Sequence, residues 1–398
     1  MNDFSPELKN RLDAVREQNL FRELRRVDSA QGPRIEIGGK SYLNFSSNDY
    51  LGLANNPVLK EAAIKAVEKF GAGAGASRLI CGSLAPFHEL EESLADFKRA
   101  EAALTFSTGY ATSIGTIGAL IGKNDIIILD KLVHASIVDA AKLSGAKLRV
   151  FAHNDLNDLE DKLKWAGKIS KAESGKRKAE ILVVTESIFS MDGDAAPLRE
   201  IVMLKEKYGA WLMVDEAHAT GIIGENGRGL ADELGVSSQI EIQMGTLGKA
   251  LGSSGGYICG SRALIDYLVN RARSFIFSTA PVPAAAAAAK AAIQFVQSSE
   301  GERRRKHLRA RVAEFQSQIS NLKSQIPGAI IPILIGDESK AVEAAAKLRE
   351  QDIFVPAIRY PTVARGKARL RVTFTASHSA DDVATLVRAL EQIINRKS

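Results

Sequence analysis

The chain has 398 residues, of which 45% are hydrophobic and 25% charged, and its 53 basic and 47 acidic side chains leave a net charge of +6. These values exclude a disordered or fibrous chain, and the two cysteines exclude a disulfide framework and favour a reducing compartment. No basic block alternates with aromatic residues and no apolar run reaches membrane-spanning length, so we expect no nucleic-acid partner, no membrane insertion and a cytoplasmic location.

The first predicted element is an amphipathic helix from Ser5 to Arg26, with Ser5 as its N-cap and Arg22 inside it. Its apolar stripe consists of Leu8, Leu12, Val15, Leu20 and Leu24. Two short strands, Ile35–Ile37 and Tyr42–Phe45, follow around a Gly38-Gly39 turn. These elements form the predicted N-terminal segment, residues 1–48.

A polar turn and a glycine-rich loop come next. In Ser46-Ser47-Asn48-Asp49-Tyr50, the Asn-Asp pair is ordinary turn chemistry, but the Asn48 amide can also hold a carboxylate. Residues 71–78, Gly-Ala-Gly-Ala-Gly-Ala-Ser-Arg, lack the spacing of a dinucleotide fingerprint and follow a helix, Pro57–Phe70, rather than a strand. We expect a flexible loop that lines a substrate channel.

Seven short apolar strands are predicted between residues 103 and 259, separated mainly by helices. They are Ala103–Phe106, Ile126–Asp130, Leu148–Phe151, Ile181–Glu186, Trp211–Asp215, Ile240–Met244 and Tyr257–Cys259. A strand as apolar as Trp211–Asp215 is typical of a parallel sheet covered on both faces. Such sheets bind ligands at the carboxyl ends of their strands.

Polar residues follow four of these strands. Gly109 and Tyr110 open a helix whose first N–H groups can bind an anion, although a plain N-cap would look the same. His134 begins the helix after the strand Ile126–Asp130, where a histidine is usually a cap or a core residue. Ser190 lies in the loop after Glu186, and Asp215, Glu216 and His218 end the apolar strand that begins at Trp211.

Lys249 lies in a loop of small residues, Thr246-Leu247-Gly248-Lys249-Ala250-Leu251-Gly252-Ser253-Ser254-Gly255-Gly256. Such neighbours let a bulky group approach the backbone, and the hydroxyls of Thr246, Ser253 and Ser254 could hold an anion. This setting is typical of a lysine whose amine forms a Schiff base with a carbonyl. The alternative is a surface loop with an incidental lysine.

The segment Phe275–Pro281, which contains Thr279, ends this part of the chain. An alanine-rich helical run then continues into a charged helix through Leu322 that links to a small C-terminal α/β domain. In its last strand Arg369 and Arg371 share a face, and an arginine fork suits a carboxylate. The alternative is an exposed basic edge strand, which fits Arg369 better.

The order Asp215, His218, Lys249 resembles that of the fold-type I pyridoxal-phosphate enzymes, and within them the α-oxoamine synthases. The segments 46–50, 132–136 and 189–193 match motifs of that family, and the resemblance runs from Phe21 to about His378. It implies an α/β fold in which a large domain, residues 49–283, holds a mostly parallel seven-stranded sheet between helices. A smaller C-terminal part, residues 284–398, and the N-terminal helix and hairpin complete the expected fold.

The resemblance also implies roles for individual residues. Lys249, Asp215, His218 and His134 would be catalytic and contact pyridoxal 5'-phosphate: the lysine as Schiff base, the aspartate at the ring nitrogen, His218 at the phenolic oxygen and His134 stacked on the ring. Further cofactor contacts are implied for Gly109, Tyr110, Ser190, Thr246 and, from the partner subunit of a homodimer, for Thr279. Substrate contacts are implied for Arg22, Asn48, Ser77, Thr362 and Arg371.

The implied reaction joins L-alanine to a pimeloyl thioester, carried by coenzyme A or acyl carrier protein, with loss of CO₂, on the route to biotin. The segments 78–82 and 245–252 also resemble family members that join glycine to acetyl-CoA, whereas 46–49, 151–155 and 358–363 favour the first reaction. Two non-enzymatic alternatives remain. One is a partner subunit without the lysine, which the presence of Lys249 opposes, and the other is a nucleotide-binding protein, which only the loop 71–78 favours.

Overall fold

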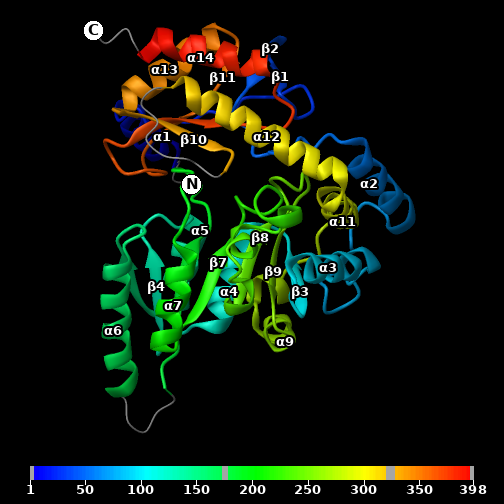
Figure 1. The fold of residues 1–398 in the computed structure, drawn as a ribbon, viewed down its shortest axis with the longest axis vertical. Helices are drawn as coiled ribbons and strands as arrows, with labels where there is room; N and C mark the ends of the chain where they lie inside the picture. Colours follow the sequence, from blue (N-terminus) through cyan, green and yellow to red (C-terminus); the bar gives the residue numbers. More distant parts are fainter. Residues whose placement is uncertain (1–3, 173–177, 320–327, 395–398) are drawn as a thin grey trace. The chain divides into compact units, whose positions relative to one another are not determined.

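The computed structural model describes residues 4–172, 178–319 and 328–394 of the chain (Figure 1). The described residues divide into two compact units. The first comprises those within Met1–Ser47, Leu308–Gln325 and Ala329–Ser398, and the second those within Asn48–His307 and Ile326–Gly328. The sequence-based division at residues 48 and 283 differs from this one, because the N-terminal residues share a unit with the C-terminal part.

The larger unit contains a seven-stranded sheet with the strand order β3-β9-β8-β7-β6-β4-β5. β9 is antiparallel to both of its neighbours, and the other neighbouring pairs are parallel. This arrangement confirms the predicted fold class. The strands are β3 (Ala102–Phe106), β4 (Ile126–Asp130), β5 (Lys147–Phe151), β6 (Ile181–Glu186), β7 (Trp211–Asp215), β8 (Ile242–Thr246) and β9 (Gly256–Gly260).

Helices cover this sheet, which explains why its central strands are mostly apolar. All five residues of β4 and all six of β6 are buried, as expected for strands packed on both faces. One core cluster joins the sheet to α4, α5, α9 and α10. The helices of this unit are α2 (Pro57–Phe70), α3 (Ala85–Lys98), α4 (Gly109–Leu120), α5 (Ala135–Ser144), α6 (Leu156–Ala172), α7 (Leu198–Tyr208), α8 (Leu230–Glu233), α9 (Arg262–Arg271), α10 (Arg273–Ile276) and α11 (Pro283–Gln297).

The smaller unit joins both ends of the chain through strand pairing. The hairpin of β1 (Arg34–Ile37) and β2 (Lys40–Asn44) is extended by β11 (Ile353–Phe354), which pairs in parallel with β2; Figure 1 shows blue β1 and β2 beside orange β11. A second sheet has the order β10-β13-β12. The other elements are α1 (Ser5–Glu17), β10 (Ile330–Gly336), α13 (Glu338–Glu350), β12 (Ala357–Ile358), β13 (Ala368–Thr373) and α14 (Ala380–Ile394).

The predicted N-terminal helix is too long. α1 ends at Glu17 and none of its side chains is buried. Asn19 adopts a positive φ of 56°, a conformation typical of a residue just beyond a helix end. Arg22 is therefore not helical, and the residue before the helix is Phe4 rather than Ser5.

Two further predictions in the smaller unit are wrong. The single strand predicted at Phe354–Ala357 is two short strands in different sheets, with Pro356, which has no N–H to donate, between them. Arg369 is not on an exposed edge strand, because β10 and β12 flank β13 on both sides and Arg369 is 5% exposed. The linking helix α12 (Ser299–Gln318) was predicted to reach Leu322, which lies outside the described residues.

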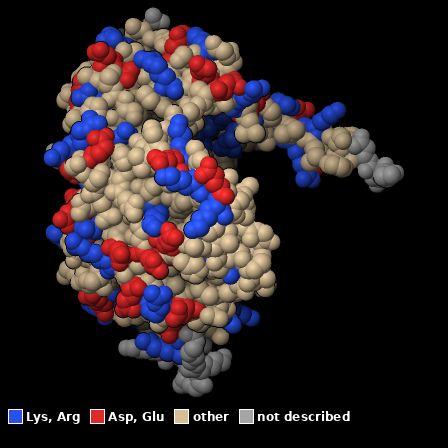
Figure 2. Space-filling view, turned by 90° about the vertical axis from the view of Figure 1, so that its right-hand side faces the viewer, with Lys and Arg blue, Asp and Glu red and all other residues tan. Residues whose placement is uncertain are grey.

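The surface agrees with the small net charge. Figure 2 shows basic and acidic side chains interspersed over the visible face instead of gathered into one basic patch. Within the described residues, the helices are too short or too polar to cross a membrane.

Candidate active site

A cavity of about 200 Å³ lies at the carboxyl ends of the central strands, where the sequence predicts the site. It contains seven predicted site residues: Gly109, Tyr110, His134, Asp215, His218, Thr246 and Lys249. Ser136, Glu186, Ala217 and Met244 also line it. Parallel strands bring these residues together because their carboxyl ends meet at one edge of the sheet.

Lys249 is held by a tight turn just after β8. The Gly252 N–H donates to the Lys249 carbonyl at 2.9 Å, and the Ser253 N–H donates to the Leu247 carbonyl at 2.9 Å. Gly252 adopts a φ of +60°, and a Cβ there would lie 2.6 Å from the Ala54 nitrogen, so the turn requires glycine. The Ser253 hydroxyl, expected to be available for an anion, donates instead to the Ala285 carbonyl at 2.7 Å.

Asp215 is the carboxyl group of β7 that faces the cavity. Its Oδ1 accepts a hydrogen bond from the Ala217 N–H at 2.9 Å. Burial raises the pKa of Asp215, while the charge of Lys249 and the Ala217 N–H act in the opposite direction. The cavity therefore pairs a lysine and a carboxyl group in a weakly screened environment.

Glu216, the next residue, has a structural role. Strand side chains alternate in direction, and Glu216 is fully buried against the ammonium group of Lys98, which also contacts the Arg228 carbonyl. The second Glu216 oxygen accepts from the Ala231 N–H at 3.0 Å. Of the two carboxylates that end the predicted strand, only Asp215 lines the cavity.

His134 is oriented by Ser136, a residue that the sequence did not single out. The Ser136 backbone N–H donates to His134 Nδ1 at 3.2 Å, and the Ser136 hydroxyl lies 2.8 Å from the same atom. Because a backbone N–H can only donate, Nδ1 is the acceptor and the ring proton is on Nε2. Burial lowers the pKa of His134, and the Lys249 charge lowers it further, so the imidazole is neutral.

His218 is oriented by Tyr50. The Tyr50 hydroxyl lies 2.6 Å from His218 Nδ1 and 3.2 Å from the Asn48 side-chain oxygen. Tyr50 is fully buried. The predicted turn 46–50 therefore supports the histidine, and the structure places Asn48 beside Tyr50.

The other predicted residues lie outside the lining of this cavity. The Ser190 backbone N–H donates to Glu186 Oε2 at 3.2 Å. Ser77 and Thr279 pair with each other in an isolated antiparallel bridge. Arg22, Thr362 and Arg371 belong to the smaller unit: Arg22 donates to the Tyr360 carbonyl at 3.3 Å, the Thr362 N–H to the Arg359 carbonyl at 3.0 Å, and Arg371 to Thr373 Oγ1 at 3.0 Å.

The cavity fits the cofactor that the sequence resemblance implies. A Cβ at Gly109 would lie 2.6 Å from Thr246 Cγ2, so only glycine leaves this space open. Thr246 Oγ1 is buried without a hydrogen-bond partner among the described residues, next to the N-terminus of α4, where backbone N–H groups can bind a phosphate. Asp215 offers a carboxyl group for a protonated ring nitrogen, and Lys249 offers an amine for the carbonyl carbon.

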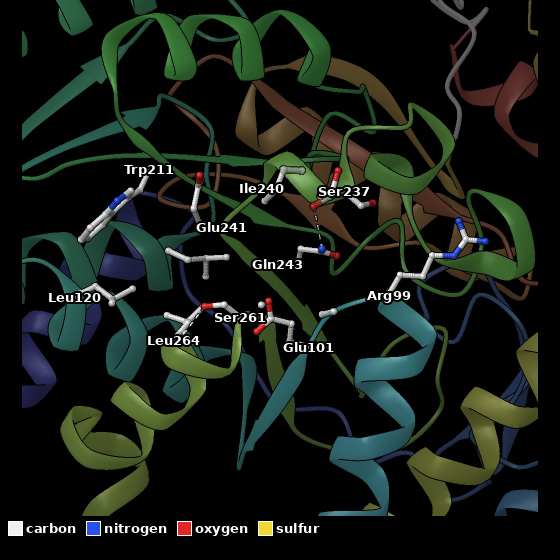
Figure 3. Close-up of a pocket in the computed structure, with 14 residues that line it drawn as sticks. Arg99, Glu101, Leu120, Trp211, Ser237, Ile240, Glu241, Gln243, Ser261 and Leu264 are labelled. Atoms are coloured by element: carbon white, nitrogen blue, oxygen red, sulfur yellow. Dashed lines mark hydrogen bonds between the residues drawn. The ribbon is translucent and has the colours of Figure 1, made fainter.

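A larger cavity of about 500 Å³ lies at the opposite ends of the strands (Figure 3). Figure 3 shows Trp211 and Leu120 on one side and Arg99 on the other, with Gln243 bonded to Ser237. Its charged groups already have partners: Arg99 pairs with Glu225 at 3.2 Å, Glu101 accepts from the Arg262 N–H at 2.9 Å, and Lys205 pairs with Glu241 at 2.7 Å. No Lys, His or Cys lines it, so we place the site in the smaller cavity. Within the described residues, no group of three or more His, Cys, Asp and Glu could hold a metal ion.

Comparison with known proteins identifies the family of the chain. The family model for aminotransferase class I and II matches residues 40–390. The 8-amino-7-oxononanoate synthase of Geotalea daltonii is 47% identical over 385 residues, covering 96% of both chains. That of Thermoanaerobacter pseudethanolicus is 44% identical over 391 residues, covering 97% of this chain and 96% of the relative.

Solved structures with a similar fold include two enzymes. Serine palmitoyltransferase from S. paucimobilis, with a bound PLP–myriocin aldimine, has a TM-score of 0.89 and 28% identity, covering 100% of this chain and 99% of that one. The 8-amino-7-oxononanoate synthase of Francisella tularensis has a TM-score of 0.74 and 29% identity, covering 89% and 97%. The chain therefore belongs to the aminotransferase class I and II family, and the two curated relatives described above are 8-amino-7-oxononanoate synthases.

Proposed function

We infer that the protein is a pyridoxal-phosphate-dependent acyltransferase that condenses L-alanine with a pimeloyl thioester to form 8-amino-7-oxononanoate, CO₂ and the free thiol of the acyl carrier, in biotin biosynthesis. One observation carries the chemistry: Lys249, Asp215, His134 and His218 meet in a single cavity. The substrates follow from curated relatives that are 44% and 47% identical along nearly the whole chain.

Pyridoxal phosphate, when bound, supplies an electron-withdrawing ring that takes up the negative charge of the amino-acid carbanion. Asp215 would hold a proton on the ring nitrogen. Lys249 Nζ would hold the cofactor at its carbonyl carbon, with loss of water; once the alanine amine has replaced it there, the freed lysine amine would be positioned to take the proton from the alanine α-carbon. The neutral His134 ring would stack on the cofactor ring and His218 would donate to the phenolic oxygen. Thr246 Oγ1 and the Gly109 and Tyr110 N–H groups would bind the phosphate.

We propose that the substrate carboxylate is bound by Arg371 and Asn48, and that Arg22, Thr362 and Ser77 contribute further contacts. Arg371 is 5% exposed and donates to Thr373 Oγ1. A guanidinium group in so dry a position suits a bidentate carboxylate contact. These roles rest on the sequence resemblance and on the local contacts of each residue.

We further propose that the protein is a cytoplasmic homodimer, and the surface around Thr279 supports the dimer. Apolar side chains are strongly exposed next to the Ser77–Thr279 bridge: Leu79 50%, Ile80 79%, Phe277 70% and Val282 48%. Exposed apolar clusters of this kind mark association surfaces. Ser77 and Thr279 form the bridge beside these exposed side chains, which supports a contact of both residues with a second subunit.

A mixing experiment tests the shared site. Lys249→Ala and Thr279→Ala subunits are unfolded together, refolded and assayed at limiting pyridoxal phosphate. If Thr279 serves the neighbouring cofactor, each hybrid dimer has one intact site, and random pairing gives activity up to about a quarter of wild type. The same proteins refolded separately and then combined are the control. No gain over that control would contradict a shared site.

A substrate test separates the two reactions that the sequence leaves open. Alanine or glycine is offered with pimeloyl-CoA or acetyl-CoA, and thiol release is followed. We expect alanine with pimeloyl-CoA to exceed glycine with acetyl-CoA by at least about tenfold in kcat/KM, which corresponds to ~1.4 kcal/mol of differential transition-state binding. The reverse preference would replace the proposed substrates and leave the fold and cofactor unchanged. Pimeloyl-loaded carrier protein as a third acyl donor would identify the natural carrier.

A further inference from the structure

Two buried carboxyl groups, those of Asp215 and Glu186, lie side by side in the site. The proposed reaction uses Asp215 but assigns no function to Glu186. Glu186 ends β6, Asp215 ends β7, and the two residues are partners in the parallel register of these strands. Partners on neighbouring strands direct their side chains to the same face. Both line the cavity, and they are 2% and 6% exposed.

The surroundings favour a negative charge on Asp215 over one on Glu186. The other titratable groups that line the cavity are Tyr110, His134, His218 and Lys249, and the charge of the neighbouring Glu216 raises the pKa of Asp215. For Glu186, burial raises the pKa well above its ordinary value and the Asp215 charge raises it further, against the opposite effects of Lys249 and of the His134 and Ser190 N–H groups. Adjacent buried carboxyl groups do not readily ionise together, because their repulsion is weakly screened.

The hydrogen bonds of Glu186 point to the same conclusion. Its Oε2 accepts from the Ser190 N–H at 3.2 Å. Its Oε1 is buried and has no hydrogen-bond partner among the described residues. An unpaired carboxylate oxygen in this position would be costly, whereas the O–H of a carboxylic acid would be a donor for the molecule that fills the cavity.

We propose that Glu186 is an un-ionised carboxylic acid in the working enzyme and positions the cofactor by donating a hydrogen bond into the cavity. The inference rests on the proposed function in one respect, namely that pyridoxal phosphate occupies this cavity. The reaction itself also favours an un-ionised Glu186. The cofactor ring must take up negative charge during the reaction, and a second carboxylate beside Asp215 would oppose that charge.

Infrared spectroscopy of the pyridoxal-phosphate-bound enzyme tests the protonation state directly. At pH 8 the wild type should show a carboxylic-acid C=O band that shifts in D₂O and is missing from Glu186→Gln. Glu241→Gln is the matched control, since Glu241 is bonded to Lys205 at 2.7 Å and its loss should leave the band in place. If the wild type lacks the band, or Glu186→Gln retains it, the proposal is overturned.

The pH dependence of stability gives a second readout. The folded-state pKa of Glu186 lies above the ordinary value near 4.5, so the folded protein retains a proton that the unfolded chain releases. Glu186 therefore lowers stability increasingly as the pH rises above that value. The Tm of Glu186→Gln minus that of wild type should grow between pH 5 and pH 8. A difference independent of pH would indicate a packing role only and contradict the proposal.

Cofactor affinity tests the hydrogen bond. Glutamine keeps a neutral donor, so Glu186→Gln should bind pyridoxal phosphate within about twofold of wild type, whereas Glu186→Leu should bind about tenfold more weakly. Equal losses in both variants would overturn the donor role. If the leucine variant does not fold, the proposal is tested by the cofactor affinity of Glu186→Gln and by the infrared band of the wild type. These readouts do not depend on the acyl substrate, so a failed substrate test leaves them interpretable.

Discussion

Lys249→Ala should abolish turnover and leave the fold intact. The side chain lies in a cavity, and the turn that holds it is built from backbone hydrogen bonds that alanine retains. Losing a positioned proton acceptor alone lowers a rate by about 10²–10⁴-fold, and the variant also loses the amine that binds the cofactor carbonyl. The measurements are kcat with alanine and pimeloyl-CoA, and circular dichroism for the fold.

Borohydride reduction makes this prediction specific. Reduction of the yellow wild-type enzyme should fix the cofactor to the peptide that contains Lys249, and the alanine variant should give no labelled peptide. Lys131→Ala, which removes an exposed lysine between β4 and α5, is the control and should be labelled like wild type. Labelling of another lysine, or substantial turnover by Lys249→Ala, would remove Lys249 from the proposed chemistry.

Asp215→Asn should lower the rate by at least about a hundredfold while the protein stays folded. An opposite charge close to a titratable group shifts its pKa by about 1–3 units, and the neutral amide cannot hold the proton on the ring nitrogen in the same way. Asparagine has nearly the same shape and retains an oxygen for the Ala217 N–H. The measurements are kcat and the pH dependence of the cofactor absorbance, which should titrate at lower pH in the variant.

The neighbouring Glu216 provides a matched contrast. Glu216→Gln should reduce stability, because it leaves the buried Lys98 ammonium group without its counter-charge, a loss of about 3–5 kcal/mol. Asp215→Asn should affect the rate far more than the unfolding midpoint. If the two substitutions gave the same pattern, the assignment of one carboxylate to the site and the other to the core would be wrong.

Sequence patterns predicted the large sheet well, because its strands are short apolar runs that end at polar turn residues. β4 and β6 begin and end at the predicted residues, Ile126–Asp130 and Ile181–Glu186. The rule that ligands bind at the carboxyl ends of parallel strands predicted Asp215 at the site, and the family resemblance predicted His134 and Lys249 beside it.

Local patterns failed in the smaller unit. Helical spacing of apolar residues continues to Arg26, yet α1 ends at Glu17 and buries none of its side chains. Spacing alone cannot show whether an apolar stripe packs against another part of the protein, so the predicted helix was too long. The short apolar run at Phe354–Ala357 is divided between two sheets, since β11 pairs with β2 from the other end of the chain.

The sequence by itself determined the order of the strands along the chain, the glycine-flanked lysine and the family to which the chain belongs. The tertiary structure alone decided which polar residues meet. Tyr50 and His218 are 168 positions apart and bond at 2.6 Å, and Glu186 lies beside Asp215 only through the β6–β7 register. Such pairs leave no local pattern, because register and side-chain direction are set when the strands pack together.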